Sequence, residues 1–483
     1  MITWYLVISM SKKKKTKIKI SFVGNNSCDV TGSMILIETQ YKNILLECGM
    51  MQSFSSIVDY KENAKSFPFK PKNIDYVFLG HAHIDHIGRL PKLVKDGFIG
   101  KIIATEITAK LLKPMLTDSA NIIRKDAEYI SKKREIDYEP FYNVDDITNT
   151  LDLTYEYDYG TVYELDENVS FKLLHNSHLI GACQIELFLK TSTGHIEKIL
   201  YTSDLKGLQN KNHYVEDTQF CTKASVVISE CTYGAIGKNG SENRNKDLEK
   251  IKTVVNQVCL MDKGKLLIPV FSLSRAQEIL TNLYNLFGED KNFKIPIVLD
   301  SPLIWEITKT YKEALKGEHK ELFKKVCSWE NVRFIKDYNE SKVCMRDNSP
   351  KIVLSSSGFL HKGRSIQYLK EYISSVKNHI LFVGYSPPNS IASKIKLGKK
   401  NITIDGMSYK NRCGITILNS FSSHIQREEL LNYLKNINCD KIYLVHGGQS
   451  GKIEFQESLE SELTKCNKTT KVICTNKGTV CNL

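Results

Sequence analysis

The chain has 483 residues, of which 41% are hydrophobic and 25% charged, as in ordinary globular proteins with room for two or more domains. No segment is apolar over a membrane-spanning length without charges, and the 13 cysteines form no CxxC pair, so we expect a cytoplasmic protein with reduced thiols and no membrane partner. The net charge of +13 favours a polyanionic partner, although a lysine-rich composition bias explains it equally well.

The first half of the chain alternates strand-like and helical patterns without a long linker. Residues 17–49 combine period-2 runs with Gly/Asn turns, which indicates a β-meander. Residues 71–107 have the pattern of a strand, a polar loop, a helix and a second strand, and residues 107–134 have apolar positions at helical spacing. Further strands are predicted at 171–174, 184–189, 198–201 and 224–228. This alternation predicts a layered α/β domain over 17–234.

The character of the chain changes after Gly234. Residues 237–245 are polar and rich in Gly and Asn, which indicates a crossing between domains. Helix–strand units follow at 247–261, 266–271, 275–287, 295–300 and 305–315, with strands at 352–355 and 380–383. These units predict a doubly wound parallel domain over 235–412. Near residue 413 the chain reverts to strands and ligand-like residues, so we expect a segment over 413–483 that returns to the first domain.

The densest polar motif is His81-Ala82-His83-Ile84-Asp85-His86, directly after a strand-like apolar run. His81 and His83 are two apart, so in an extended segment they point to the same side. Asp85 and His86 diverge and, from the start of a helix, face a second point in space. Imidazole and carboxylate suit borderline dications, zinc first and manganese second. One loop therefore offers ligands to two metals, but the remaining ligands must come from later in the chain.

Three later residues have the right chemistry at the right place. His178 lies in a turn between two predicted strands, and Asp204 and His446 each end a short apolar strand. In layered α/β sheets the carboxyl ends of the strands are where sites form. Each residue taken alone fits an ordinary polar turn, but together with the six-residue motif they complete a two-metal site.

At this point the sequence resembles a known family: the metallo-β-lactamase-fold hydrolases, and among them the β-CASP nucleases that process RNA. The ligand motifs match in family order at His81, His83, Asp85, His86, His178, Asp204 and His446. The motifs that distinguish the β-CASP group match Glu230 in Ser-Glu-Cys-Thr-Tyr-Gly, His424 in Ser-Phe-Ser-Ser-His, and His446 again. The resemblance runs from about Lys17 to the C-terminus.

The resemblance implies an α/β fold: a metallo-β-lactamase αββα sandwich with an inserted β-CASP domain of doubly wound α/β type. It implies a metal-dependent ribonuclease that hydrolyses RNA phosphodiester bonds at a dinuclear zinc centre, as an endonuclease, a 5′–3′ exonuclease or both. RNA is then the expected partner, and a homodimer or an RNA-processing complex is compatible with the family.

The resemblance also assigns roles to residues. His81, His83 and His178 would hold one metal, Asp85, His86 and His446 the other, and Asp204 would bridge them. Asp85 counts among the catalytic residues as well. His424 would protonate the departing 3′-oxygen, and Glu230 would fix the tautomer of His424.

Four positions depart from the family pattern. Glu47 replaces a usual Asp that resembles a carboxylate orienting a metal ligand. Ser177 and Ser203 each replace a usual Gly, and Gln426 stands where Asp is frequent. Weaker expectations concern phosphate binding, for which Gly- and Ser-rich turns and cations are suited. The candidates are Ser355, Ser356, Ser357, Arg275 and Arg364.

Other functions remain open at the level of sequence. A DNA nuclease of the same fold is less favoured because DNA-repair members usually lack His at the third β-CASP motif, where this chain has His446. A non-catalytic scaffold is disfavoured because such paralogues lose ligands. Hydrolysis of a small molecule would leave residues 235–412 without a role.

Overall fold

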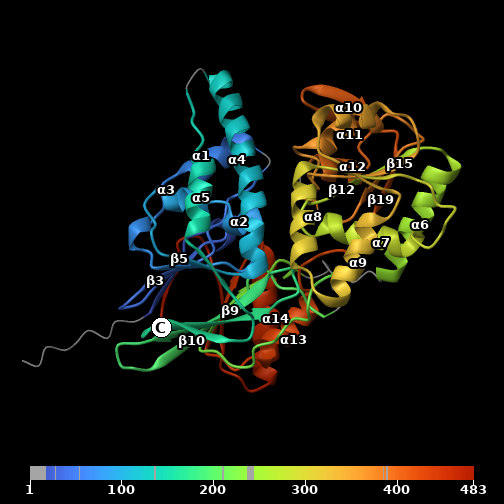
Figure 1. The fold of residues 1–483 in the computed structure, drawn as a ribbon. Coiled ribbons are helices and arrows are strands. Elements are labelled where there is room, and N and C mark those ends of the chain that lie inside the picture. The colour runs from blue at the N-terminus through green and yellow to red at the C-terminus, as the bar shows by residue number, and fades with distance from the viewer. Residues whose placement is uncertain are drawn as a thin grey trace, which may run out of the picture.

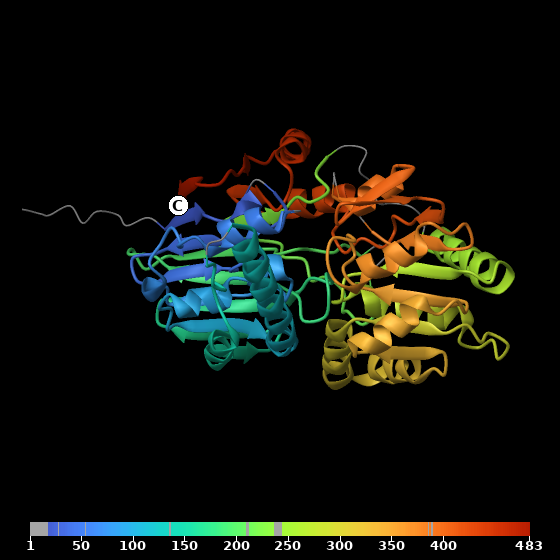
Figure 2. The same ribbon diagram turned by 90° about the horizontal axis from the view of Figure 1, so that it is seen from above.

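The computed structural model describes residues 18–27, 29–53, 55–134, 137–208, 212–235, 244–384, 386–387 and 390–483. These residues form two bodies that lie side by side (Figures 1 and 2). The polar segment 237–245, predicted to cross between domains, lies outside the described residues except for Arg244 and Asn245.

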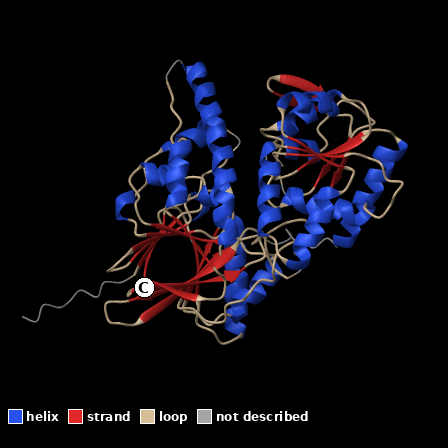
Figure 3. Ribbon diagram, viewed as in Figure 1, coloured by secondary structure: helices blue, strands red, loops and turns tan. Residues whose placement is uncertain are grey.

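The first body contains two seven-stranded sheets packed face to face (Figure 3). The first sheet has the order β22-β1-β2-β3-β4-β5-β6 and the second the order β21-β20-β11-β10-β9-β8-β7. The strands of the first sheet are β1 (Lys19–Phe22), β2 (Ile35–Glu38), β3 (Asn43–Leu46), β4 (Tyr76–Phe78), β5 (Lys101–Thr105), β6 (Thr154–Tyr157) and β22 (Val480–Asn482). Those of the second are β7 (Val162–Asp166), β8 (Val169–His175), β9 (Cys183–Lys190), β10 (Ile196–Tyr201), β11 (Val226–Glu230), β20 (Lys441–Val445) and β21 (Lys471–Cys474).

Apolar residues alternate along these strands, so each sheet has one face toward the other sheet and one toward helices. Between the sheets, the Phe78 and Phe171 rings meet edge to face at 5.1 Å. The first sheet is covered by α1 (Ser56–Ala64), α2 (Ile84–Ile87), α3 (Leu90–Lys95), α4 (Glu106–Arg134) and α5 (Val144–Asp152). The second is covered by α13 (Arg427–Asn436) and α14 (Gln449–Lys465). The predicted αββα sandwich is confirmed.

The second body is built on a six-stranded, wholly parallel sheet with helices on both faces. The strand order is β14-β13-β15-β12-β16-β19. From β12 the chain reaches one edge through β13 and β14, returns to the middle at β15, and reaches the other edge through β16 and β19, as predicted for a doubly wound unit. Its strands are β12 (Lys265–Pro269), β13 (Ile297–Asp300), β14 (Val332–Ile335), β15 (Lys351–Ser355), β16 (His379–Phe382) and β19 (Gly414–Ile417). A hairpin of β17 (Asn401–Ile404) and β18 (Met407–Lys410) precedes β19.

The first helix of this body precedes β12, and the others come between its strands in the chain. The helices are α6 (Arg244–Val255) with a π-helical turn (Asn256–Met261), α7 (Arg275–Phe287), α8 (Pro302–Ala314), α9 (Gly317–Ser328), α10 (Tyr338–Arg346), α11 (Arg364–Tyr372) and α12 (Ile391–Lys396).

Strand β19 bears on where the chain returns to the first body, which the sequence predicts near residue 413. This strand pairs in parallel with β16, with Ile380 opposite Ile415 and Phe382 opposite Ile417, so it belongs to the second sheet. A four-residue strand of alternating Thr and Ile has no feature that tells which sheet it joins. We therefore propose that the second domain ends after Ile417. Beyond it, β20 pairs with β11 and β22 with β1, which returns the chain to the first body.

The two bodies meet along α4 and α8, which lie next to each other (Figure 1). Lys362, just beyond the carboxyl end of β15, forms an ion pair of 2.7 Å with Asp126 on α4. Tyr214, in a loop of the first body, bonds the Thr281 hydroxyl of α7 at 2.6 Å. Loops at the carboxyl edge of the second sheet therefore contact the first body.

Candidate metal centre

The strand β4 positions the histidine motif. Its residues are buried, and the chain leaves it through Gly80, where a Cβ would lie 2.1 Å from Ser203 Oγ and 2.6 Å from Glu47 Oε1. Only glycine fits there. His81 and His83 follow in extended backbone, and α2 begins so that Asp85 and His86 lie in its first turn.

One cluster of ligand atoms gathers around His83 Nδ1. This atom lies 3.0 Å from His81 Nε2 and 3.3 Å from His178 Nε2. Asp204 Oδ2 is 3.7 Å from both of those Nε2 atoms. Tetrahedral zinc has bonds of roughly 2.0–2.1 Å, so its four ligand atoms lie about 3.3 Å from one another. The four atoms of this cluster are suited to that arrangement.

A second cluster gathers around the other oxygen of Asp204. Its Oδ1 lies 3.3 Å from His86 Nε2 and 3.4 Å from His446 Nε2. Asp85 Oδ2 is 3.6 Å from each of those two nitrogens. Asp204 thus presents one carboxylate oxygen to each cluster, and all seven predicted ligand residues are brought together.

The outer ring nitrogens of the histidines have partners that set their tautomers. His178 Nδ1 donates to the Ser423 carbonyl at 2.9 Å, and His446 Nδ1 lies 3.0 Å from Thr232 Oγ1. Thr232 Oγ1 itself donates to the His446 carbonyl at 3.1 Å, so it accepts from the His446 ring. Both rings therefore turn an Nε2 lone pair inward.

These residues fit divalent metal ions. Burial, together with neighbouring rings, holds the pKa of His81 and His178 well below the ordinary value and lowers the pKa of His83 to about 4. The three rings are therefore neutral at neutral pH. Three converging nitrogens then have too few protons to form hydrogen bonds with one another. In the second cluster, Asp204 Oδ1 and His446 Nε2 are buried without a hydrogen-bond partner among the described residues. Cations would satisfy both sets of lone pairs.

His424 lies beside both clusters, with its ring 5.0 Å from that of His178 and 5.5 Å from that of His446. Its Nδ1 is 3.0 Å from Glu230 Oε2 and 3.2 Å from Oε1, and Thr232 Oγ1 is 3.3 Å away. Burial disfavours the protonated ring, but the Glu230 carboxylate more than offsets this and raises the pKa of His424. The Leu205 backbone N–H also donates to Glu230 and fixes that carboxylate.

The residues predicted to bind phosphate form hydrogen bonds or ion pairs with other residues of the protein. Ser355 Oγ donates to the Asp300 carbonyl at 2.8 Å, and Arg364 pairs with the Asp300 carboxylate inside the second body. Arg275 is buried between Glu278 and Ser423. Ser356 bonds Ser301 at 2.9 Å, and Ser357 bonds the Lys362 carbonyl at 3.1 Å. Ser355 and Arg364 thus have polar atoms that already hold the second body together, and a phosphate role for these five residues stays a prediction.

Several residues that touch the site were not singled out by their chemistry in the sequence. Thr232, Ser423 and Ser33 each place an oxygen against a ligand ring, Ser33 Oγ at 3.3 Å from His86 Nε2. Isolated hydroxyl residues carry no recognisable signal, and only their proximity to the ligand motifs in the sequence hinted at a role.

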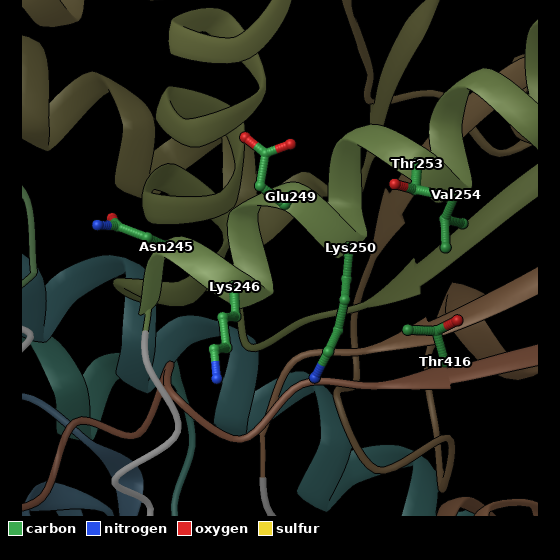
Figure 4. Close-up of a pocket in the computed structure, with 7 residues that line it drawn as sticks. All are labelled: Asn245, Lys246, Glu249, Lys250, Thr253, Val254 and Thr416. Carbon is green, nitrogen blue, oxygen red and sulfur yellow. The ribbon is translucent and has the colours of Figure 1, made fainter.

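A separate hollow of about 600 Å³ is lined by residues of the second body (Figure 4). It runs between α6 and β19, and Lys246 and Lys250 point the same way along it. Its lining contains no histidine and a single carboxylate, Glu249, so it lacks the groups for metal-dependent hydrolysis.

Three family models match the chain in succession. They are the metallo-beta-lactamase superfamily at residues 29–154, the Beta-Casp domain at 276–395, and the Zn-dependent metallo-hydrolase RNA specificity domain at 408–472. Ribonuclease TTHA0252 of Thermus thermophilus is 30% identical over 429 residues, covering 87% of this chain and 91% of its own length. The chain belongs to the β-CASP group of the metallo-β-lactamase superfamily.

Other members of the β-CASP group align over most of this chain. Transcription termination factor FttA of Methanocaldococcus jannaschii is 26% identical, covering 92% of this chain and 69% of its own length. Integrator complex subunit 11 of Danio rerio is also 26% identical, covering 95% and 75%. A crystal structure of an Enterococcus faecalis protein of unknown function matches with a TM-score of 0.53 at 12% identity, covering 97% of this chain and all of that one, which supports the fold alone. Among the described residues, none of the helices is long and apolar enough to span a membrane.

Proposed function

We propose that this protein is a metal-dependent ribonuclease that hydrolyses RNA phosphodiester bonds at a dinuclear centre. The observation that carries the proposal is the placement of Asp204, whose two oxygens face two separate clusters of ligand atoms. Zinc is the expected ion at both, with manganese as the alternative. The similarity to a protein named as a ribonuclease supports RNA as the substrate.

The chemistry divides between the ions and the protein. When bound, divalent ions supply positive charge for the phosphate and make water acidic enough to furnish a nucleophile near neutral pH. Three histidines, His81, His83 and His178, would hold the first ion, and Asp85, His86 and His446 the second. Asp204 fixes the separation of the two sites, because its carboxylate is buried and cannot turn without losing both sets of contacts.

His424 is placed to act as the general acid. Its Nδ1–H is held by Glu230, so its other ring nitrogen, Nε2, is left to carry a proton to the departing 3′-oxygen. Glu230 favours the protonated ring electrostatically and prevents the ring from turning over. These two residues come from the ends of different elements, β11 and the loop after β19.

RNA contacts are expected from cationic side chains, given the net charge of +13. Binding should weaken steeply with salt, because each phosphate neutralised by Lys or Arg releases a counterion from the single strand. Assembly as a homodimer or within an RNA-processing complex belongs to the same proposal, as one similar protein is named a complex subunit. Cytoplasmic location is proposed on the cysteine usage alone.

The test uses purified protein stripped of metal and reloaded with zinc or manganese. An RNA oligonucleotide with a labelled 5′ monophosphate or triphosphate is incubated beside DNA of the same sequence, with Asp204→Ala as the inactive control. Metal-dependent RNA cleavage is the expected result, and the product ladder separates endonuclease from 5′–3′ exonuclease action. Cleavage of DNA alone would favour a DNA nuclease. Two bound metals without any cleavage would favour a scaffold.

A further inference from the structure

A single buried carboxylate lies on the outer side of both ligand clusters. Glu47 follows β3 and is fully buried. Its two oxygens accept from the Gly80 N–H at 3.0 and 3.1 Å, and its Oε1 lies 3.2 Å from His86 Nδ1. Glu47 therefore contacts the outer nitrogen of a histidine whose inner nitrogen faces the second cluster.

Ser203 connects the same carboxylate to the first cluster. The Ser203 hydroxyl donates to Glu47 Oε1 at 3.1 Å and lies 3.2 Å from His81 Nδ1. A hydroxyl has one proton, so a Ser203 that donates to Glu47 must accept from the His81 ring. His81 is thereby fixed with Nδ1 protonated and the Nε2 lone pair directed at the first cluster.

We propose that Ser203 is a positioning residue whose hydroxyl links the Glu47 carboxylate to the His81 ring. One carboxylate then orients a metal-binding histidine in each cluster. This inference rests on the proposed dinuclear centre. It makes the two metal sites dependent on a shared support, in addition to the bridge that Asp204 provides between them.

The local backbone brings the hydroxyl to this position. Ser203 has φ of 51°, a left-handed conformation that favours glycine. Glycine at position 80 leaves the space in which Ser203 Oγ and Glu47 Oε1 meet.

Glu47, His81 and His86 also lie close enough together to hold an ion by themselves. Donors from Gly80 and Ser203 already occupy the Glu47 carboxylate, which favours support over ligation.

Ser177 offers a matched control. It also has a left-handed backbone, with φ of 55°, is also buried, and also directly precedes a ligand residue. Its hydroxyl, however, donates to the Glu216 carbonyl and meets Thr218, away from any histidine ring. Variants at both positions therefore lose a hydroxyl from a left-handed serine beside the site. Only the Ser203 hydroxyl contacts the ring of a proposed ligand.

The experiment measures metal affinity by competition with a chelator, using cobalt to distinguish the three-histidine cluster from the carboxylate-rich cluster by their visible spectra. Ser203→Ala and Ser203→Gly should each weaken the three-histidine cluster about 10- to 100-fold and leave the other cluster within about 3-fold. Glu47→Gln should weaken both clusters. Ser177→Ala and Ser177→Gly should leave both unchanged.

A second readout does not need metal or substrate. In metal-free protein, nitrogen chemical shifts of His81 should report a proton on Nδ1, and in Ser203→Ala this preference should be lost. The inference is overturned if Ser203→Ala leaves the His81 tautomer and both affinities unchanged, or if the Ser177 variants lose as much metal as the Ser203 variants. Failure of wild-type protein to cleave RNA while these effects persist would count against the proposed ribonuclease and not against the role of Ser203.

Discussion

Two buried aspartates, one in each body, follow the ends of β-strands and differ in what surrounds them. Asp204, after β10, is ringed by histidine nitrogens, and its Oδ1 has no hydrogen-bond donor among the described residues. Asp300, at the end of β13, accepts from Ser341 Oγ at 2.6 Å and Tyr368 OH at 2.5 Å and pairs with Arg364. The two carboxylates are equally buried but differ in whether protein groups neutralise them. A carboxylate among lone pairs requires a cation from outside, whereas a carboxylate among donors is already complete.

The largest expected effect comes from Asp204→Ala. It removes an oxygen from each cluster, so RNA cleavage should fall below detection and metal content should drop. The fold should be kept, because no packed apolar group is lost. Cleavage assays, metal analysis and thermal unfolding of the same preparation check this, and a variant that unfolds would show that Asp204, like Asp300, is chiefly structural.

His424→Ala separates proton transfer from metal binding. Because His424 is not among the seven proposed ligands, metal content and RNA affinity should stay nearly unchanged, while kcat falls about 10²- to 10⁴-fold. The defect should shrink on a nitrophenyl phosphodiester, whose leaving group needs no proton. Equal impairment on both substrates, or loss of metal, would make His424 a ligand or a structural residue.

Arg364→Ala tests the Asp300 carboxylate, whose partners all come from the protein. It leaves Asp300 buried without its cation and should lower the free energy of unfolding by about 3–5 kcal/mol, with activity per folded molecule retained. Arg333→Ala is the control, since its ion pair with Glu340 is exposed and should be worth less than about 1 kcal/mol. Denaturant titration measures both. A stable Arg364→Ala variant with weakened RNA binding would instead support the phosphate role expected from the sequence.

The smallest expected effect concerns Lys396, a half-buried cation with a carbonyl as its acceptor. Its Nζ donates to the Gly384 carbonyl at 2.6 Å, and burial lowers the pKa of Lys396 to about 8. In the unfolded chain the pKa of this lysine is about 10.4. Between these values the unfolded state binds more protons, so stability should rise with pH over this window.

The matching measurement is denaturant unfolding at several pH values between 8 and 10.5. Lys396→Met should lack the rise that the wild type shows, and Lys294→Met, at an exposed position, should retain it. An identical pH dependence in wild type and Lys396→Met would mean that Lys396 keeps its charge in the folded protein.

The order of elements and the seven residues that gather in the two clusters could be predicted from the sequence, because both leave local signals. Apolar alternation indicates buried strands, and three histidines and an aspartate within six residues after such a strand indicate metal ligands. The sheet to which β19 belongs and the contacts that Ser355 and Arg364 make within the fold could not be predicted. Whether β19 joins the first or the second sheet depends on a partner strand more than thirty residues earlier in the chain.

By itself the sequence determined which residues have the chemistry to bind metal, since ligand type is a property of each side chain. Only the tertiary structure decided which partners complete the other buried groups: Arg364 pairs with Asp300, and Ser203 joins Glu47 to His81. The reason is that hydrogen bonding and electrostatics act over a few ångströms, between residues such as Glu47 and Ser203 that lie 156 positions apart in the chain.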